Sequence, residues 1–454
     1  MTAERLSALD ASFLAVESPR TPMHVGWVAT FDAPASGDTP SFDELYEHVA
    51  ARLARAPRFR QRLAGVPLGL HDPVWVDDPR FDPSNHLRHA EGDDLGAHAD
   101  AVFSTPLARD RPLWEVWIAD GLPGGEVALI GKMHHCMVDG VAVAELGKLL
   151  LDRRPENDGE LDRDAWTPAP GPSAGARFAR AVVDRAADGA VLALAPARIA
   201  TSPARLAALP GAARRGARTA AHALLPPARS SPLNRPGSSE RHLVRLTRPL
   251  DQVRDLRRRF GVTPNDVVLA ACAGALRRFA ERRGEEPRPL KAMVPADVRT
   301  SDDSAGGNRI SFLFFELPCD EADPVERVRA VNRVTAQRER DGEAADVDAA
   351  FGVLARTPPP LQRMLAHAFA HPRLFNLTVS SIPGPAVPRF LRGCRLREVH
   401  PAVPLTDRHA LSIGVVTVAG NACFGLYADA LSLPDADVLA RDLEDSLDEL
   451  LRAP

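Results

Sequence analysis

The feature that most constrains the fold is a strand that ends in two adjacent histidines and is followed at once by a helix. Residues 126–133 form a short apolar run after the turn-forming residues 122–125, a pattern typical of a buried strand. Residues 141–151 then repeat apolar side chains at helical spacing. His134 and His135 therefore lie where the strand meets the helix. Because successive strand side chains point to opposite faces, only one of the two can face a given cavity.

The residues of this junction favour proton-transfer chemistry. A neutral imidazole can take a proton from a hydroxyl or thiol near pH 7. Asp139 adds a carboxylate and Gly140 a flexible turn residue. A structural interpretation is also open, in which the histidines are core residues and Asp139 caps the next helix. A metal site is disfavoured, because neighbouring strand histidines diverge and the sequence has no His-Glu-x-x-His helix.

Composition limits the class of protein. The chain has 454 residues, of which 45% are apolar, enough for two or three domains with sizeable cores. Its formal net charge of −4 argues against a nucleic-acid partner. Five scattered cysteines without C-x-x-C spacing indicate reduced thiols, with neither a disulfide framework nor a zinc site. The sequence shows neither a signal-peptide pattern nor a membrane span, so we expect a cytoplasmic protein, peripheral at most to the inner membrane face or lipid inclusions.

Strands and helices alternate in both halves, which predicts an α/β protein. In the first half, the predicted strands are residues 27–31, 72–76 and 111–118, and the predicted helices are residues 41–56 and 96–103. In the second half, the predicted strands are residues 242–247, 290–295, 310–317, 375–380, 411–418 and 422–427. The predicted helices there are residues 250–260, 263–282, 326–338, 361–370 and 435–451. There is neither a glycine-rich phosphate loop nor a G-x-S-x-G elbow.

A basic segment separates the two halves. Between Ser173 and Arg229 there are nine arginines and two acids, Asp184 and Asp188, a net charge of +7. One interpretation is a helical or partly disordered linker with a solvated face. A sharper hypothesis is a basic amphipathic surface that touches anionic lipid. We therefore expect an N-terminal domain at 1–155, a linker at 156–240 and a C-terminal domain at 241–454.

The long apolar helix of the second half has a complete start signal. Thr263 is placed as N-cap, Pro264 at the first helical position and Asp266 three residues after the cap. Capping is therefore a structural explanation for Asn265 and Asp266.

Several motifs resemble known enzymes. His-His-x-x-x-Asp-Gly between a strand and a helix is the signature of the CoA-dependent acyltransferase superfamily, and residues 134–140 resemble it at every fixed position. Further motifs, in the same order along the chain, are similar to the bacterial wax ester synthase/diacylglycerol acyltransferase (WS/DGAT) family. These are residues 6–26, Pro112-Leu113-Trp114, Asn265-Asp266, residues 376–385, Asp429 and residues 433–435.

The resemblance implies two similar α/β domains of the chloramphenicol acetyltransferase-like type, each a mixed sheet flanked by helices, with an active-site tunnel between them. It implies that acyl-CoA enters from one side as a substrate and a diacylglycerol or long-chain alcohol enters from the other. The products would be triacylglycerol or wax esters. No bound cofactor and no metal are expected, and contact with a membrane or lipid-droplet surface would be peripheral.

The resemblance also implies roles for the motif residues. His135 would be the general base and His134 mainly structural, while Gly140 would let the backbone turn close to the site. Asp139 would point away from the substrate and pair with an arginine of the second domain. Arg299 matches the setting of that arginine, so we hypothesise an Asp139–Arg299 ion pair that holds the loop.

Three positions depart from the family pattern. Cys136 stands where alanine is more frequent, and we interpret it as a small buried residue and not as a nucleophile. Ser381 replaces the usual asparagine, and residues 417–420 replace a Ser-Tyr-x-Gly pattern, which bears on the choice of acceptor. Alternatives are therefore transfer to a glycolipid or polyketide hydroxyl, condensation with carrier-bound donors, and a lipid-surface protein without catalytic activity.

Overall fold

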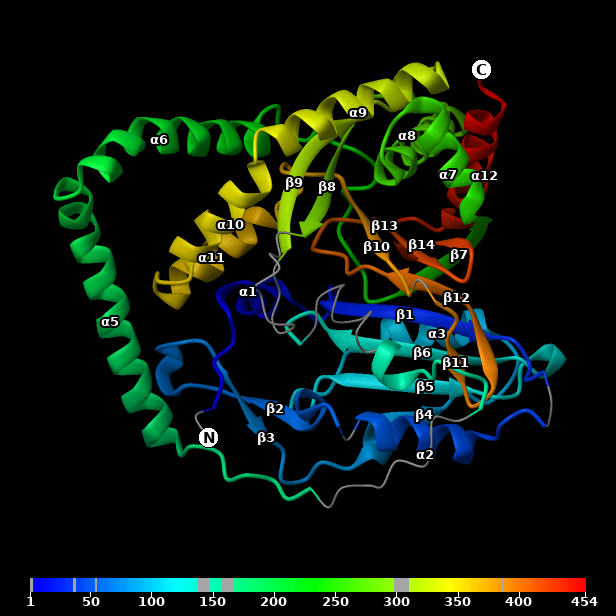
Figure 1. Cartoon of the computed structure of the whole chain (residues 1–454), viewed down its shortest axis with the longest axis horizontal. Helices are drawn as coiled ribbons and strands as arrows, with labels where there is room; N and C mark the ends of the chain where they lie inside the picture. The colour runs from blue at the N-terminus through cyan, green and yellow to red at the C-terminus, as the bar shows by residue number, and fades with distance from the viewer. Residues whose placement is uncertain are drawn as a thin grey trace.

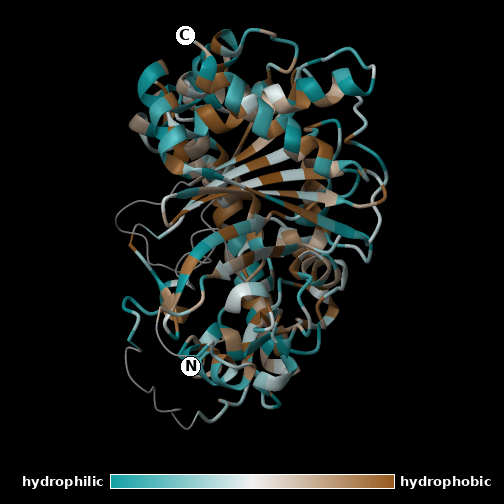
Figure 2. Cartoon of the chain, turned by 90° about the vertical axis from the view of Figure 1, so that its right-hand side faces the viewer, coloured by the Kyte–Doolittle hydropathy of each residue, from teal (hydrophilic) through white to brown (hydrophobic). Residues whose placement is uncertain are grey.

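Two six-stranded sheets, one above the other in Figure 1, form the centre of the molecule. The computed structural model describes residues 3–35, 38–53, 55–137, 147–156, 166–297, 310–385 and 387–454. Hydrophobic residues run along the strands between the helical layers, whereas the helices at the upper surface are largely hydrophilic (Figure 2). This is the distribution expected when each sheet buries its faces against helices.

The first sheet carries the histidine pair and has the strand order β11-β12-β1-β6-β5-β4. Its strands are β1 (His24–Phe31), β4 (Leu87–His89), β5 (Trp114–Ala119), β6 (Val127–His134), β11 (Phe390–Leu391) and β12 (Cys394–Ala402). Helix α2 (Phe42–Leu53) packs on one face and α3 (Leu95–Ser104) on the other. Every residue of β6 is buried, which explains the apolar run at residues 127–131, and Lys132 and His134 are buried with it.

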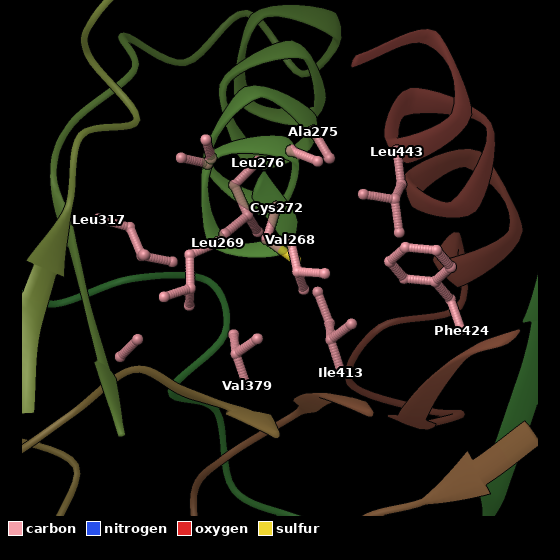
Figure 3. Close-up of a cluster of buried hydrophobic side chains, with 14 of the residues drawn as sticks. Val268, Leu269, Cys272, Ala275, Leu276, Leu317, Val379, Ile413, Phe424 and Leu443 are labelled. Atoms are coloured by element: carbon pink, nitrogen blue, oxygen red, sulfur yellow. The ribbon is translucent and has the colours of Figure 1, made fainter. Parts of the chain in front are cut away.

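The second sheet has the order β7-β14-β13-β10-β8-β9, with β10 parallel to both of its neighbours. Its strands are β7 (Arg241–Pro249), β8 (Leu290–Asp297), β9 (Ile310–Leu317), β10 (Leu377–Pro383), β13 (Leu411–Val418) and β14 (Asn421–Asp429). Helix α8 (Pro264–Arg282) and helix α12 (Ala436–Arg452) cover it. Figure 3 shows side chains of α8 above Val379 of β10 and Ile413 of β13, with Phe424 of β14 beside Leu443 of α12.

The remaining elements are smaller or lie at the periphery. They are α1 (Ala8–Val16), β2 (Gln61–Ala64), β3 (Val74–Asp77), α7 (Leu250–Phe260), α9 (Pro324–Arg340), α10 (Glu343–Leu354), α11 (Pro359–Phe369) and four short 3-10 turns (Pro57–Arg60, Pro67–Gly69, Pro83–Asn85 and Pro123–Gly125). Of the predicted helix 141–151, only residues 147–151 are described, and 147–150 are helical.

The start of α8 follows the sequence prediction. Thr263 accepts the backbone N–H of Asp266, and the Asp266 carboxylate accepts the backbone N–H of Thr263. Pro264 is the first helical residue. This reciprocal cap satisfies two of the four N–H groups that a helix leaves unpaired at its start.

One segment differs from the domain boundaries expected from the sequence. Residues 390–402 belong to the expected C-terminal domain at 241–454, but β12 pairs antiparallel with β1 of the first sheet. The sequence does not predict this strand, because the adjacent charged residues Arg397 and Glu398 break its alternation and Pro401 removes a backbone donor. β12 lies between β1 and the two-residue strand β11. The first sheet is therefore completed by the second half of the chain.

The basic segment between the halves contains two long helices, α5 (Ala174–Ala200) and α6 (Pro203–Leu224), which run along one side of the molecule (Figure 1). Most of their residues are exposed. The end of α6 is attached to the second half, because Arg218 pairs with Asp341 at 2.8 Å and His222 contacts Glu343 at 2.9 Å. Among the described helices, none is both long and apolar enough to cross a membrane.

Candidate active site

A cavity of about 300 Å³ lies between the two halves and is bordered by His135. Its walls come from both sheets and from the segment after the histidine motif. Residues of β1, β6 and β12 line one side, and residues of β9, β10 and the loop after β10 line the other. Among the described residues that line it there is no Asp, Glu, Lys or Arg, and His135 is the one histidine. The cavity therefore suits a largely apolar ligand that reacts at one titratable group.

His135 is held from two sides by the N-terminal segment. Its backbone N–H donates to the carbonyl oxygen of Met23 at 2.9 Å. Its imidazole stacks on the ring of Phe13 in α1, with centroids 3.8 Å apart and an interplanar angle of 11°. These contacts fix both the backbone and the ring plane of the histidine that lines the cavity.

His134 points away from the cavity and is fully buried. Its Nδ1 accepts the backbone N–H of Cys136 at 3.1 Å, so in the neutral ring the proton is on Nε2. Nε2 lies 3.4 Å from a carboxylate oxygen of Glu17. Burial, and then the positive charge of Arg109, hold the pKa of His134 well below its usual value of 6.5. His134 is therefore neutral at physiological pH.

Glu17 connects several parts of this region. One carboxylate oxygen accepts the backbone N–H of Met23 at 3.3 Å, and the other forms an ion pair with Arg109. No sequence pattern indicates Glu17 or Arg109, and Phe13 stands out only as part of the Leu-Asp-x-x-Phe motif of the family resemblance. Phe13 and Glu17 fall within residues 6–26, which the family resemblance marks, but no sequence pattern places them beside a distant strand end.

The Pro112-Leu113-Trp114 motif supports the same strand end from the other side. The carbonyl oxygen of Leu113 accepts the backbone N–H of His134 at 2.9 Å. Trp114 is buried, and its indole N–H donates to the carbonyl oxygen of Phe59 at 2.8 Å. None of the three residues lines the cavity.

Asp266 has a structural environment. Besides its cap contacts, it accepts hydrogen bonds from Asn332 at 2.9 Å and Thr335 at 2.6 Å, both in α9. Its neighbour Asn265 is half-buried at the start of α8. Neither residue lines the cavity. Asp139, Gly140 and Arg299 lie outside the described residues, and so does the hypothesised ion pair.

The structure shows the surroundings of the positions that depart from the family pattern. Cys136 is buried, and burial raises the pKa of its thiol far above the usual range, so it is protonated at neutral pH. Ser381 and residues 382–385 line the cavity. A Cβ on Gly384 would lie 2.2 Å from the carbonyl oxygen of Thr417, so only glycine permits this approach of the loop to β13.

Comparisons with known proteins agree with this architecture. A family model described as the wax ester synthase/diacylglycerol acyltransferase catalytic domain matches residues 6–268, and one described as the WS/DGAT C-terminal domain matches residues 306–451. The chain is 33% identical to a protein named as a diacylglycerol O-acyltransferase in Mycobacterium tuberculosis strain CDC 1551, over 99% of this chain and 90% of that protein. It is 32% identical to another M. tuberculosis protein of that name, tgs2, over 98% of each chain.

Solved structures give the same result. The wax ester synthase/diacylglycerol acyltransferase from Marinobacter aquaeolei VT8 superposes with a TM-score of 0.70 at 25% identity, covering 99% of this chain and 98% of that one. The first condensation domain of the calcium-dependent antibiotic synthetase shares the fold, with a TM-score of 0.60 at 16% identity over 99% of this chain and 97% of that one. The expected two-domain acyltransferase fold is confirmed. The chain belongs to the wax ester synthase/diacylglycerol acyltransferase family.

Proposed function

We propose that this chain transfers a long-chain acyl group from acyl-CoA to the hydroxyl of a diacylglycerol or a long-chain alcohol, forming triacylglycerol or wax ester. The observation that carries the proposal is the position of His135, the one histidine among the described residues that line an apolar cavity between the halves. The names of the M. tuberculosis and Marinobacter relatives support the choice of acceptors.

In the proposed mechanism His135 is the general base. Its imidazole takes the proton of the acceptor hydroxyl as that oxygen attacks the thioester carbonyl carbon. The tetrahedral intermediate collapses by breaking the carbon–sulfur bond, and the imidazolium returns the proton to the CoA thiolate. Base catalysis by a positioned histidine is worth roughly 10²–10⁴-fold in rate. His134, Asp139, Gly140 and Arg299 are proposed to hold the motif in shape without touching the reacting atoms.

The test is CoA release from palmitoyl-CoA by purified protein, with dioleoylglycerol or hexadecanol as acceptor and the lipid products separated by chromatography. We expect acceptor-dependent release and an ester product with at least one of the two alcohols. His98→Ala is the matched control for His135→Ala, because His98 is a half-buried histidine of α3 that does not line the cavity. A folded protein that forms no ester with either alcohol would contradict the proposal and turn attention to other hydroxyl acceptors.

We also propose that the enzyme meets its water-insoluble substrates at a lipid surface through α5 and α6. These helices expose apolar side chains, among them Val183 at 64%, Leu194 at 51% and Leu206 at 52% of their surface. Nine arginines and two acids lie between residues 173 and 229. Apolar side chains between cations are the composition of helices that lie on anionic membranes.

Vesicle flotation tests the lipid-surface proposal. We expect the protein to float with vesicles that contain phosphatidylglycerol and less with pure phosphatidylcholine. Val183→Asp combined with Leu194→Asp should reduce flotation. Leu431→Asp is the control, because Leu431 is 70% exposed on the loop after β14. Equal flotation of the double variant and the wild type would remove α5 from the proposal.

A further inference from the structure

A tryptophan on the cavity side of β1 lies flat on a glycine of the neighbouring strand. Five residues of β1 line the cavity: Gly26 and the alternate residues Val25, Trp27, Ala29 and Phe31, whose side chains share one face of the strand. Trp27 is the register partner of Gly131 in β6. A Cβ on Gly131 would lie 2.3 Å from both Cε2 and Cζ2 of the indole. The indole therefore occupies the space that any side chain at position 131 would need.

Strand geometry gives the position of this tryptophan relative to the proposed base. His135 lies opposite Met23, because its N–H donates to the Met23 carbonyl oxygen. Trp27 is four residues further along β1, roughly 13 Å at the rise of a β-strand, and Phe31 is roughly 27 Å away. The cavity lining continues past Trp27 to Ala29 and Phe31. Trp27 therefore lies part of the way along an apolar channel that leads away from His135.

The indole is bounded by β6 on one side and borders the cavity on the other. Gly131 and the backbone of β6 lie beneath it, and the cavity lies on its other side. Adding a methyl group at position 131 would therefore push the ring into the channel. A chain that reacts at His135 and ends before Trp27 would not meet the displaced ring, whereas a longer chain would.

We propose that Trp27, seated on Gly131, sets the length of the linear hydrocarbon chain that this side of the cavity accepts. The inference rests on the proposed acyl transfer, since the chain must present its reacting end at His135. The chain belongs either to the acyl group or to the alcohol, and the recognition chemistry is the same for both. A hydrocarbon chain has no polar groups, so its pocket selects it by shape alone. A bulky rigid side chain can therefore limit the chain length that fits.

The first test measures chain-length preference in Gly131→Ala. One series uses octanoyl-, lauroyl- and palmitoyl-CoA with a fixed alcohol, and the other uses octanol, dodecanol and hexadecanol with fixed palmitoyl-CoA. We expect the long-to-short ratio of kcat/KM to fall by roughly tenfold or more in one series, since blocking space for even one methylene costs about that much. The series in which the ratio falls identifies the chain that occupies the channel.

Two further variants show whether the indole transmits the effect. In Gly131→Ala combined with Trp27→Leu, the smaller side chain leaves room for the new methyl group, so the long-to-short ratio of kcat/KM should rise again toward the wild-type value. The matched control is Gly274→Ala in α8, outside the cavity lining, where the added Cβ would lie 2.2 Å from the hydroxyl oxygen of Ser446. We expect Gly274→Ala to lower thermal stability and leave the long-to-short ratio unchanged.

The proposal is overturned if folded Gly131→Ala keeps the wild-type ratio in both series, or if the double variant keeps the defect. Failure of acyl transfer itself has a different signature, because the wild type would then form no ester with any pair of substrates. In that case, equilibrium binding of octyl- and hexadecyl-CoA thioethers and of the free alcohols decides. If Gly131→Ala binds only the long ligands more weakly, the result supports the proposal that Trp27 sets the accepted chain length. Equal weakening of short and long ligands overturns it.

Discussion

At the residue scale, His134 and His135 have different surroundings although they are adjacent. His134 is neutral, buried and bonded to the backbone of Cys136, whereas His135 borders the cavity with its ring stacked on Phe13. Strand alternation alone predicts that the two side chains diverge. The contacts with Phe13 and Glu17 could not be predicted, because they depend on where α1 packs in three dimensions.

Phe13→Leu should lower kcat by roughly two- to tenfold, since a stacked aromatic pair is worth about 0.5–1.5 kcal/mol and its loss frees the ring of His135. KM should change less, because Phe13 is absent from the cavity lining. Steady-state kinetics with palmitoyl-CoA measures both. Phe81→Leu is the matched control: it removes a Phe81–His86 stack with centroids 5.5 Å apart, away from the cavity. Equal kcat values for the two variants would show that the Phe13 stack does not position His135.

For the helices and strands, the sequence predicts features that depend on neighbouring residues and does not predict those that depend on tertiary packing. The cap of α8 was predicted because Thr263, Pro264 and Asp266 act within one helical turn. Strand β12 was not predicted, because its pairing with β1 depends on how the two halves of the chain pack together. The role of Asp266 is also larger than its cap, since it joins α8 to α9 through Asn332 and Thr335.

Asp266→Ala should lower the free energy of unfolding by about 2–4 kcal/mol, because it removes a cap from a fully buried position and leaves the half-buried donors Asn332 and Thr335 of α9 without this acceptor. Urea denaturation measures this. Asn265→Ala, one residue away and half-buried, should change the free energy of unfolding by less than about 0.5 kcal/mol. The KM of folded Asp266→Ala for acyl-CoA should match that of the wild type. A large rise in KM would instead assign the Asn-Asp motif to substrate binding.

His242 joins three elements, and its contacts make the stability of the protein depend on pH. In β7, it contacts Asp100 of α3 at 2.6 Å and Asp437 of α12 at 3.1 Å. Partial burial opposes its charge, but the hydrogen bonds and charges of the two aspartates outweigh burial and raise its pKa above 6.5. A histidine with a raised folded pKa stabilises the protein fully below its unfolded pKa, and the effect is lost as pH rises through the folded value.

We therefore expect the thermal stability of the wild type to exceed that of His242→Gln most at pH values below 6.5. The difference should shrink as pH rises through the raised pKa. Melting temperatures of the two proteins across this range measure it. Parallel curves would show that the His242 contacts contribute no pH-dependent stability.

At the scale of the whole molecule, the two halves are joined where β12 crosses the second sheet. A Cβ on Gly425 of β14 would lie 1.9 Å from the carbonyl oxygen of Pro401, and one on Gly414 of β13 would lie 2.7 Å from the Pro401 ring. The cavity lies next to this crossing, since Pro401 and Ala402 line it. The family resemblance gave the two-domain arrangement, but this close approach of backbones follows from no local pattern.

Gly425→Ala should destabilise the protein by about 3 kcal/mol or more, because the rigid backbone of β12 must move away. Gly352→Ala is the control. A Cβ there meets nothing within 4 Å in helix α10, so it should stabilise by about 0.5–1 kcal/mol. Denaturation of both variants measures the contrast. Similar stabilities would contradict the tight crossing.

In the proposed mechanism, His135 takes the acceptor proton in an apolar cavity and is not merely a binding residue. The most direct measurement compares the wild type with His135→Ala for ester formation and for palmitoyl-CoA affinity on the same preparations. We expect ester formation to fall by roughly 10²–10⁴-fold while the Kd for palmitoyl-CoA stays nearly unchanged. Ester formation at the wild-type rate in His135→Ala would contradict it.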